Sequence, residues 1–223
     1  MTMLHIVSTP IGNLEDMTLR AIRTLKEADF IVAEDTRHAK ILLNKYEITT
    51  PLLSFHAHTT PAQLEQVLER LGRGENLALI SDAGTPGISD PGYVLIRDAI
   101  ARGITIEVIP GASALLTALV GSGLPANRFL YLGFLPLKKG RQTLLKSLAE
   151  LPYTVVIYEA PHRIEKTLSQ LHEFLGNRRI SVGRELTKKF EENFRGTLEE
   201  AREHFKAKKP KGEFTLVIGP ESI

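Results

Sequence analysis

The richest chemistry in the sequence lies in a twelve-residue stretch, SDAGTPGISDPG (81–92). It holds three glycines, two prolines, two aspartates and two serines, many more special residues than a simple connection needs. Glycines permit positive φ, expose backbone N–H groups and allow a ligand to approach the main chain closely. The stretch therefore predicts a loop that binds a ligand.

Two shorter loops have related compositions, STPIGN (8–13) and PGASA (110–114). The first matches neither the G-x-G-x-x-G dinucleotide fingerprint nor the phosphate loop, so a plain turn between strand and helix stays open for it. The second opens an apolar helix, and its small residues allow a flat or bulky ligand to lie on the helix N-terminus. Close packing of the helix on a strand is the alternative explanation for these small residues.

Each of the three loops follows a segment expected to be a β-strand. Short, nearly continuously apolar runs predict strands at residues 5–8, 29–34, 52–55, 77–81 and 106–110, as in a sheet covered on both faces. Helical spacing of apolar residues predicts helices at 18–28 and 61–72. This alternation is typical of a mostly parallel α/β sheet, in which ligands bind beyond the carboxyl ends of the strands. We therefore expect the three loops to converge on one crevice.

The segment GSGLPANRF (121–129) interrupts this pattern and predicts a boundary between two α/β domains, residues 1–121 and 122–223. In the second domain, apolar runs predict strands at 129–134, 155–160, 180–186 and 214–219. Helices are expected at about 138–151, 161–175 and 198–206. The spacing of these elements favours a more mixed sheet than in the first domain.

Composition places this chain of 223 residues among ordinary globular proteins, with 43% hydrophobic and 24% charged residues. The absence of cysteine excludes disulfides, thiolate metal sites and a cysteine nucleophile. The histidines show no metal-ligand spacing with carboxylates, so we expect no metal site. The first residues are too polar for a signal peptide, and no apolar run reaches the length of a membrane span. These features predict a cytoplasmic protein without a membrane partner.

The twelve-residue loop resembles the signature of the ribosomal RNA small subunit methyltransferase I family, within the tetrapyrrole-methylase superfamily. The resemblance covers the whole chain, through STPIGNLEDMTLRA, AEDTR (33–37), LLSFHAH (52–58), PGASALLTAL (110–119), VIYEAPHRI (156–164) and RELTKKFEE (184–192). It implies a homodimer whose protomers have two α/β domains each, with S-adenosylmethionine in the cleft between the domains. The implied reaction is 2′-O-methylation of a cytidine ribose in the decoding region of small-subunit (16S) ribosomal RNA.

The resemblance also implies which residues bind the cofactor. In the first domain they are Pro10, Ile11, Gly12, Asp82, Gly84, Thr85, Pro86, Ile88, Ser113 and Ala114. In the second domain they are Glu159 and Leu186. Thr85 stands where the superfamily has the aspartate of a Gly-Asp-Pro turn, which weakens the transfer of a carboxylate contact with the ribose, although Asp82 lies nearby.

Methyl transfer from a sulfonium is an in-line displacement that needs neither a metal nor a covalent enzyme intermediate, so positioning supplies much of the acceleration. A ribose hydroxyl is a poor nucleophile while protonated, and a base or a strong polariser should help. The candidate catalytic residues are Asp35, Arg37, His56, Glu185 and Lys188. Three alternatives stay open: Asp35 as the N-cap of a helix, His56 as a core or rim histidine, and Lys188 as a solvated surface charge.

The formal net charge is only +2, but basic residues gather at 138–146 and 178–211, with Phe190 and Phe194 as candidate stacking surfaces. We therefore expect the second domain to hold the RNA and the first to hold most of the cofactor. Two other functions stay open. One is a methyltransferase of the same fold that acts on a corrin, a porphyrin or a diphthamide precursor. The other is a non-catalytic nucleotide-binding factor in ribosome assembly.

Overall fold

The computed structural model describes residues 2–56, 59–206 and 211–221. Ala57 and His58 of the LLSFHAH motif, and Lys208 and Lys209 of the basic segment, fall outside these ranges. No helix within them is long and apolar enough to cross a membrane.

The chain divides into two compact units, Met1–Ser113 and Ala114–Ile223. The boundary lies before helix α5 (Ala114–Ser122), whereas the sequence placed it between residues 121 and 122, at the end of this helix. The physical reason is that α5 packs on strands of the second unit. The Gly- and Pro-containing segment that follows α5 is a connection inside that unit.

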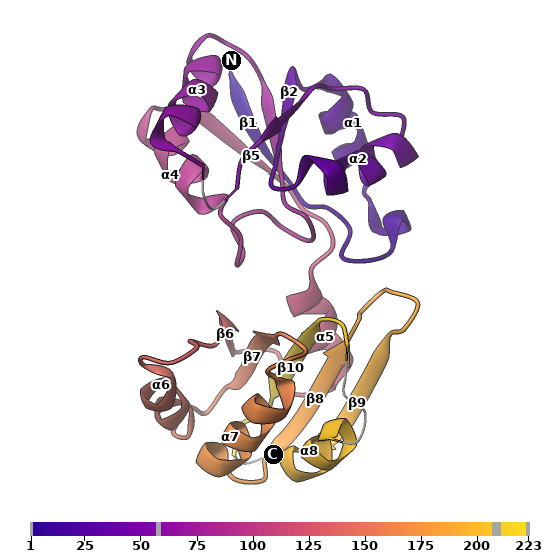
Figure 1. Ribbon diagram of the computed structural model, residues 1–223, viewed down its shortest axis with the longest axis vertical. Helices are drawn as coiled ribbons and strands as arrows, with labels where there is room; N and C mark the ends of the chain where they lie inside the picture. Colours follow the sequence, from indigo (N-terminus) through magenta and orange to yellow (C-terminus); the bar gives the residue numbers. More distant parts are fainter. Residues whose placement is uncertain (1, 57–58, 207–210, 222–223) are drawn as a thin grey trace. The chain divides into compact units, whose positions relative to one another are not determined.

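The first unit contains a five-stranded parallel sheet in the order β3-β2-β4-β1-β5 (Figure 1). Its strands are β1 (Met3–Val7), β2 (Phe30–Ala33), β3 (Leu52–Ser54), β4 (Leu77–Ile80) and β5 (Thr105–Ile109). All five overlap the segments that the apolar runs predicted, and the parallel arrangement confirms the expected sheet.

Helices cover both faces of this sheet, with α1 and α2 on one face and α3 and α4 on the other (Figure 1). The helical elements are the short 3-10 helix η1 (Leu14–Asp16), α1 (Leu19–Glu27), α2 (Thr36–Lys45), α3 (Pro61–Gly72) and α4 (Tyr93–Ala101). Alternate residues of β4 enter the two cores. Ala78 and Ile80 pack with α1 and α2, and Leu77 and Leu79 pack with α3 and α4. This two-sided burial is why the strand sequences are continuously apolar.

The winding of the chain reverses between the neighbouring strands β1 and β4. From β1 the chain passes β4 to reach β2, whereas from β4 it passes β1 to reach β5. The connections after β1 and β4 therefore leave in opposite directions, which is the topological switch point where open α/β sheets bind ligands. The sequence predicted binding loops after these same two strands.

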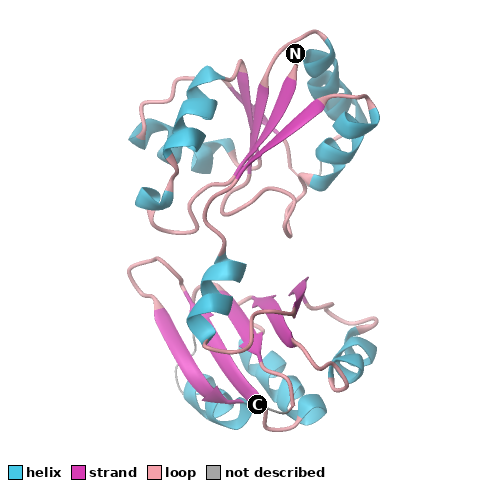
Figure 2. Cartoon of the chain, turned by 180° about the vertical axis from the view of Figure 1, so that it is seen from behind, coloured by secondary structure: helices cyan, strands magenta, loops and turns pink. Residues whose placement is uncertain are grey.

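The second unit contains a mixed sheet in the order β6-β7-β10-β8-β9, as the sequence favoured. Its strands are β6 (Phe129–Phe134), β7 (Thr154–Glu159), β8 (Arg179–Arg184), β9 (Glu192–Thr197) and β10 (Phe214–Ile218). Among the described strands of this sheet, only β6 and β7 pair in parallel. Helix α5 covers one face, and three helices cover the other (Figure 2): α6 (Arg141–Leu148), α7 (Ile164–Leu175) and α8 (Leu198–Lys206).

Two features of this unit differ from expectation. Strand β9 was not predicted, because its sequence ENFRGT is polar and it lies at the sheet edge, where alternate side chains face solvent. Helix α6 begins at Arg141, whereas the sequence predicted a start at about residue 138. Gly140, the N-cap residue, has a φ of 81°, and this left-handed conformation cannot be part of the helix.

Candidate active site

Three loops meet at the carboxyl edge of the first unit's sheet. Thr9 and Gly84 form an antiparallel bridge, in which Thr9 N donates to Gly84 O (2.8 Å) and Gly84 N donates to Thr9 O (3.1 Å). The hydroxyl oxygens of Ser8 and Thr85 lie 2.8 Å apart in a further hydrogen bond. Gly111 of the third loop packs against Ser8, since a Cβ at Gly111 would lie 2.9 Å from the Ser8 Cβ. The loops after β1, β4 and β5 are thus connected directly to one another.

Nine of the ten cofactor residues that the sequence assigned to the first domain lie on these three loops: Pro10, Ile11, Gly12, Asp82, Gly84, Thr85, Pro86, Ile88 and Ser113. Ile11 is buried, and its Cγ2 would lie 3.6 Å from a Cβ at Gly84. Ile88 is 45% exposed, and Asp82 is also exposed. The 81–92 loop therefore offers a ligand one apolar and one anionic side chain. Ala114 is the first residue of α5 and belongs to the second unit.

Gly84 has a φ of 76° and Gly87 a φ of 86°, both in the left-handed region that favours glycine. The sequence left open whether the glycines of this loop serve the backbone conformation or the approach of a ligand. The structure establishes the first role for these two residues. The second role stays a prediction.

Carboxylates gather at the same sheet edge. Glu34 follows β2, Asp82 follows β4, and Asp90 lies further along the 81–92 loop. Burial raises the pKa of Asp90 to about 6; a hydrogen bond from Ser81 opposes this shift, and the charges of Glu34 and Asp82 add to it. Burial also raises the pKa of Glu34, and the Asp82 charge raises it further. A carboxyl group with a pKa near 6 is ionised at neutral pH yet basic enough to accept a proton from a reacting hydroxyl.

The sequence did not single out Asp90 as a catalytic candidate. It stands ten residues after the end of β4, inside a loop whose glycines and prolines drew attention to cofactor binding. Only the fold shows that this aspartate is half-buried and within the electrostatic influence of Glu34 and Asp82. Among the described residues, no group of three or more His, Asp or Glu side chains has the arrangement of a metal site.

Asp35 is the N-cap of α2, as the alternative interpretation proposed. Its Oδ1 accepts a hydrogen bond from Arg37 N (2.8 Å), and its Oδ2 pairs with Arg37 Nη2 (2.9 Å). These hydrogen bonds lower the pKa of Asp35 to about 2. A carboxylate with so low a pKa is a weak base, so the geometry favours capping over proton transfer for this residue. The backbone N–H of Asp35 donates to Asp82 Oδ1 (3.1 Å), which joins the ends of β2 and β4.

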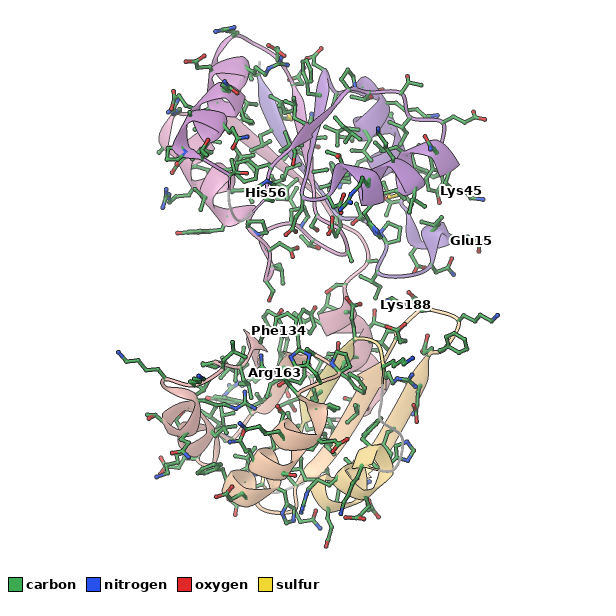
Figure 3. The ribbon with its side chains drawn as sticks, viewed as in Figure 1. Glu15, Lys45, His56, Phe134, Arg163 and Lys188 are labelled. Atoms are coloured by element: carbon green, nitrogen blue, oxygen red, sulfur yellow. The ribbon has the colours of Figure 1, made fainter. Side chains whose placement is uncertain are left out.

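His56 follows β3 and is exposed, so it is not a core histidine; Figure 3 labels it on the first unit. Its backbone N–H donates to Thr59 Oγ1 (2.8 Å). Its charge lowers the pKa of Glu34, which places the imidazole within electrostatic reach of the carboxylates at the sheet edge. His56 is therefore suited to contact a ligand there.

In the second unit, Glu159 is a buried ion-pair partner. Its side chain is fully buried, and Oε1 pairs with Arg163 Nε (3.0 Å) while Oε2 accepts from Thr167 Oγ1 (2.6 Å). Arg141 Nη2 lies 4.0 Å from Oε2 and donates to Thr167 Oγ1 (2.7 Å). Both carboxylate oxygens are thus engaged inside the protein. This arrangement favours a supporting role for Glu159 over direct contact with a cofactor.

The loop after β8 contains the other predicted residues of the second unit. Leu186 is buried and packs on Gly183, where a Cβ would lie 3.0 Å from Leu186 Cδ2. Lys188 Nζ pairs with Glu185 Oε1 (3.1 Å) and with Glu213 Oε2 (2.7 Å). Burial alone would raise the pKa of Glu185, but hydrogen bonds from Glu213 N and Lys188 lower it below its usual value. Lys188 is therefore a structural cation and not a simple solvated charge.

The chain matches the family model described as Tetrapyrrole (Corrin/Porphyrin) Methylases over residues 3–202. It is 47% identical to the Ribosomal RNA small subunit methyltransferase I of Thermotoga maritima, over 96% of this chain and 97% of that protein. The protein of the same name from a Synechocystis species is 51% identical, over 98% of this chain and 79% of its own length.

Solved structures of low sequence identity have the same fold. A cobalt precorrin-4 methyltransferase of cobalamin biosynthesis is 15% identical and superposes with a TM-score of 0.73, covering 98% of this chain and 95% of that one. A diphthine synthase is 14% identical, with a TM-score of 0.74 over 97% of this chain and 89% of its own. These two structures support the fold without bearing on the acceptor.

Proposed function

The chain belongs to the tetrapyrrole methylase family and, within it, to the ribosomal RNA small subunit methyltransferase I proteins, and on this premise we propose its reaction. It is an S-adenosylmethionine-dependent methyltransferase that acts on ribosomal RNA. The methylated atom is the 2′-oxygen of a cytidine ribose in the decoding region of small-subunit RNA. The observation that carries the proposal is the joining of three Gly- and Pro-rich loops at one sheet edge that also holds carboxylates.

The residues at this edge fit the cofactor. S-adenosylmethionine has a positively charged sulfonium and an ammonium group, and it supplies an electrophilic methyl group when bound. The carboxylates of Glu34, Asp82 and Asp90 match that positive charge, and the exposed Ile88 offers an apolar surface for a flat ring. Thr85 occupies the position of the superfamily's aspartate, and Asp82, three residues earlier, is close enough in sequence to take over the role of that carboxylate. The loops 8–13, 81–92 and 110–113 thus hold most of the cofactor in this proposal.

Asp90 is the best candidate for the base. As the ribose oxygen bonds to the methyl carbon, the bond from that carbon to the sulfonium sulfur breaks and a neutral thioether leaves. The hydroxyl proton passes to the Asp90 carboxylate, whose pKa of about 6 leaves it ionised at neutral pH. Arg37 and His56 remain candidates for orienting the acceptor at this edge. Asp35, Glu185 and Lys188 are engaged in the cap and ion pairs described above, which argues for supporting roles.

The second unit binds the RNA through its basic residues, the enzyme works in the cytoplasm, and it forms a homodimer. The dimer follows from the family resemblance. It is also supported by α5, where Leu116 and Val120 lie one helical turn apart and are 52% and 76% exposed. Light scattering that finds a stable monomer would contradict the dimer.

The decisive experiment is methyl transfer from labelled S-adenosylmethionine to isolated small ribosomal subunits. The proposal expects label in small-subunit RNA, at one cytidine whose 3′ phosphodiester resists alkaline hydrolysis because its 2′-oxygen is blocked. Label on a tetrapyrrole or on a protein instead would identify another acceptor. Cofactor binding without transfer to any of these acceptors would indicate a non-catalytic assembly factor.

A further inference from the structure

The carboxyl ends of β6, β7 and β8 lie at one edge of the second unit's sheet. β6 is parallel to β7, and β7 and β8 are both antiparallel to β10, so all three point the same way. The register places Phe134 beside Tyr158, and Phe214 beside both Glu159 and Arg184. The loops that follow β6 and β8 therefore leave from the same edge, three interstrand steps apart, or roughly 14 Å.

Each of these two loops presents an exposed phenylalanine together with exposed lysines. At the first, Phe134 is 53% exposed and is followed by Lys138 and Lys139, which are also exposed. At the second, Phe190 is 66% exposed and Lys189 Nζ lies 5.8 Å from its ring centroid. We call residues 134–140 and 187–190 the two Phe–Lys loops. Among the described residues, none of these three lysines forms an ion pair with a carboxylate within 4.0 Å.

Two arginines of the buried ion-pair network donate hydrogen bonds to the backbone of the first Phe–Lys loop. Arg141 Nη1 donates to Pro136 O (3.1 Å), and Arg163 Nη2 donates to Leu135 O (2.6 Å). Glu159, which pairs with Arg163, keeps both guanidinium groups compensated inside the protein. Phe134, Arg163 and Lys188 all lie at this end of the second unit (Figure 3). Ordering the loop in advance reduces the entropy lost when a partner binds.

The second Phe–Lys loop is held in the same manner by different residues. Lys188 is clamped between Glu185 and Glu213, and Thr187 N donates to Glu191 Oε2 (2.7 Å). Glu185 and Thr187 have φ values of 50° and 66°, a left-handed conformation that the surrounding contacts must maintain. This fixed backbone leaves Lys189 and Phe190 as the exposed tip. Phe194, expected to stack on RNA, instead packs against the Phe205 ring at a centroid distance of 6.0 Å.

We propose that the two Phe–Lys loops grip an unpaired segment of the RNA substrate, with the phenylalanine rings stacked on bases and the lysines bound to phosphates. This inference rests on the proposed function for the identity of the acceptor. Unpaired RNA fits because its bases are open to stacking, whereas duplex RNA hides them. A second copy of the chain fits less well, since a symmetric contact through this edge would bring lysines of like charge together.

The test uses the full chain and two fluorescent RNA probes, an unpaired oligoribonucleotide and a hairpin duplex. Replacing both rings, Phe134→Ala with Phe190→Ala, should weaken binding of the unpaired probe about 5- to 100-fold for each base that loses its stacking partner. Tyrosine at both positions should restore binding because it retains the aromatic face. The hairpin should bind weakly to every variant.

A second variant tests the charges. Lys138→Ala, Lys139→Ala and Lys189→Ala together should lower the slope of log affinity against log salt by about 2, since each phosphate contact on a single strand contributes about 0.7. The matched control removes three exposed cations of the first unit, on helices α1 and α2: Arg23→Ala, Lys26→Ala and Lys45→Ala. This control should change the slope by much less. Cofactor affinity should stay constant in both.

The outcomes separate this inference from the proposed function. If the wild-type protein methylates small subunits and the ring and lysine variants keep wild-type affinity and KM, the loops do not hold RNA. If those variants change the oligomeric state and leave RNA affinity intact, the edge is a contact between copies and the inference is wrong. If the protein binds the unpaired probe through both loops but transfers no methyl group, the inference stands and the proposed reaction fails.

Discussion

At the carboxyl edge of the first sheet the loops carry Glu34, Asp82 and Asp90, whereas at the corresponding edge of the second sheet they carry Lys138, Lys139 and Lys189. The first edge is shaped by the main chain, through a backbone bridge and left-handed glycines. The second is shaped by side chains, through buried ion pairs that fix the loop backbone. An acidic edge suits a cationic cofactor and a basic edge suits RNA, so one chain can hold both ligands without competition between them.

The largest expected effect tests the acidic edge. Asp90→Asn removes the candidate base while keeping the size of the side chain, and should lower kcat about 10²- to 10⁴-fold. The wild-type rate should rise with pH through about 6, as the Asp90 carboxylate forms. A single-turnover assay from pH 5 to 8 measures both. Asp98→Asn, on α4 of the same unit, is the matched control and should keep the wild-type profile; an active Asp90→Asn enzyme would refute the assignment.

Asp90→Asn should also be more stable than the wild-type protein at high pH. The native pKa of Asp90, about 6, lies above the ordinary 3.8, so the native state favours the protonated form. The contribution of Asp90 to native stability is then greatest below about pH 4 and falls as the pH rises through about 6. Asp90→Asn removes this loss and should unfold with a free energy higher by on the order of 1 kcal/mol at pH 8, after allowing for solvent screening. Urea unfolding at pH 4 and pH 8 measures the difference, which should vanish at the lower pH.

The next effect tests the buried ion pairs of Glu159, whose arginines donate hydrogen bonds to the backbone at the basic edge. Glu159→Ala leaves Arg141 and Arg163 buried without their carboxylate and should lower the free energy of unfolding by about 3–5 kcal/mol. Urea unfolding measures it, with Glu165→Ala, an exposed position on α7, as the control near zero. Glu159→Gln, titrated with S-adenosylmethionine, examines the cofactor assignment. Wild-type affinity in this variant would show that the carboxylate does not hold the cofactor.

The sequence located most of the fold because burial on both faces gives each central strand a continuous apolar run, as in β4 and β10, which are wholly buried. It missed β9, whose edge position leaves alternate side chains in solvent. The sequence also could not predict which buried side chains form ion pairs. Nothing in the spacing of Glu159 and Arg141, eighteen residues apart along the chain, indicates that they meet under one loop. The glycine-rich loops were predictable because backbone conformation restricts the residue type directly.

A smaller effect tests the main-chain design of the acidic edge. Gly84→Ala places a side chain at a φ of 76°, which should cost about 1–2 kcal/mol of stability and weaken cofactor binding as the bridge to Thr9 adjusts. Gly72 of α3 is the matched control: apart from its neighbours in the chain and its own helix backbone, no atom lies within 4 Å of its Cβ position, so Gly72→Ala should raise stability by about 0.4–1 kcal/mol. Calorimetry with S-adenosylmethionine and urea unfolding measure both variants. Unchanged cofactor affinity in Gly84→Ala would make this glycine a turn residue only.

The smallest effect separates two adjacent lysines at the basic edge. The sequence treated Lys188 and Lys189 alike, but Lys188 is clamped between two glutamates while Lys189 is exposed. Lys189→Ala should flatten the salt dependence of RNA binding by about 0.7 and leave stability unchanged. Lys188→Ala should lower the free energy of unfolding by at most about 1 kcal/mol, because its partners are partly solvated, and leave the salt slope unchanged. Binding of the unpaired oligoribonucleotide at several salt concentrations decides between them. If Lys188→Ala flattens the slope as strongly as Lys189→Ala, then Lys188 leaves its glutamates to bind phosphate, and the second edge is less rigid than its ion pairs indicate.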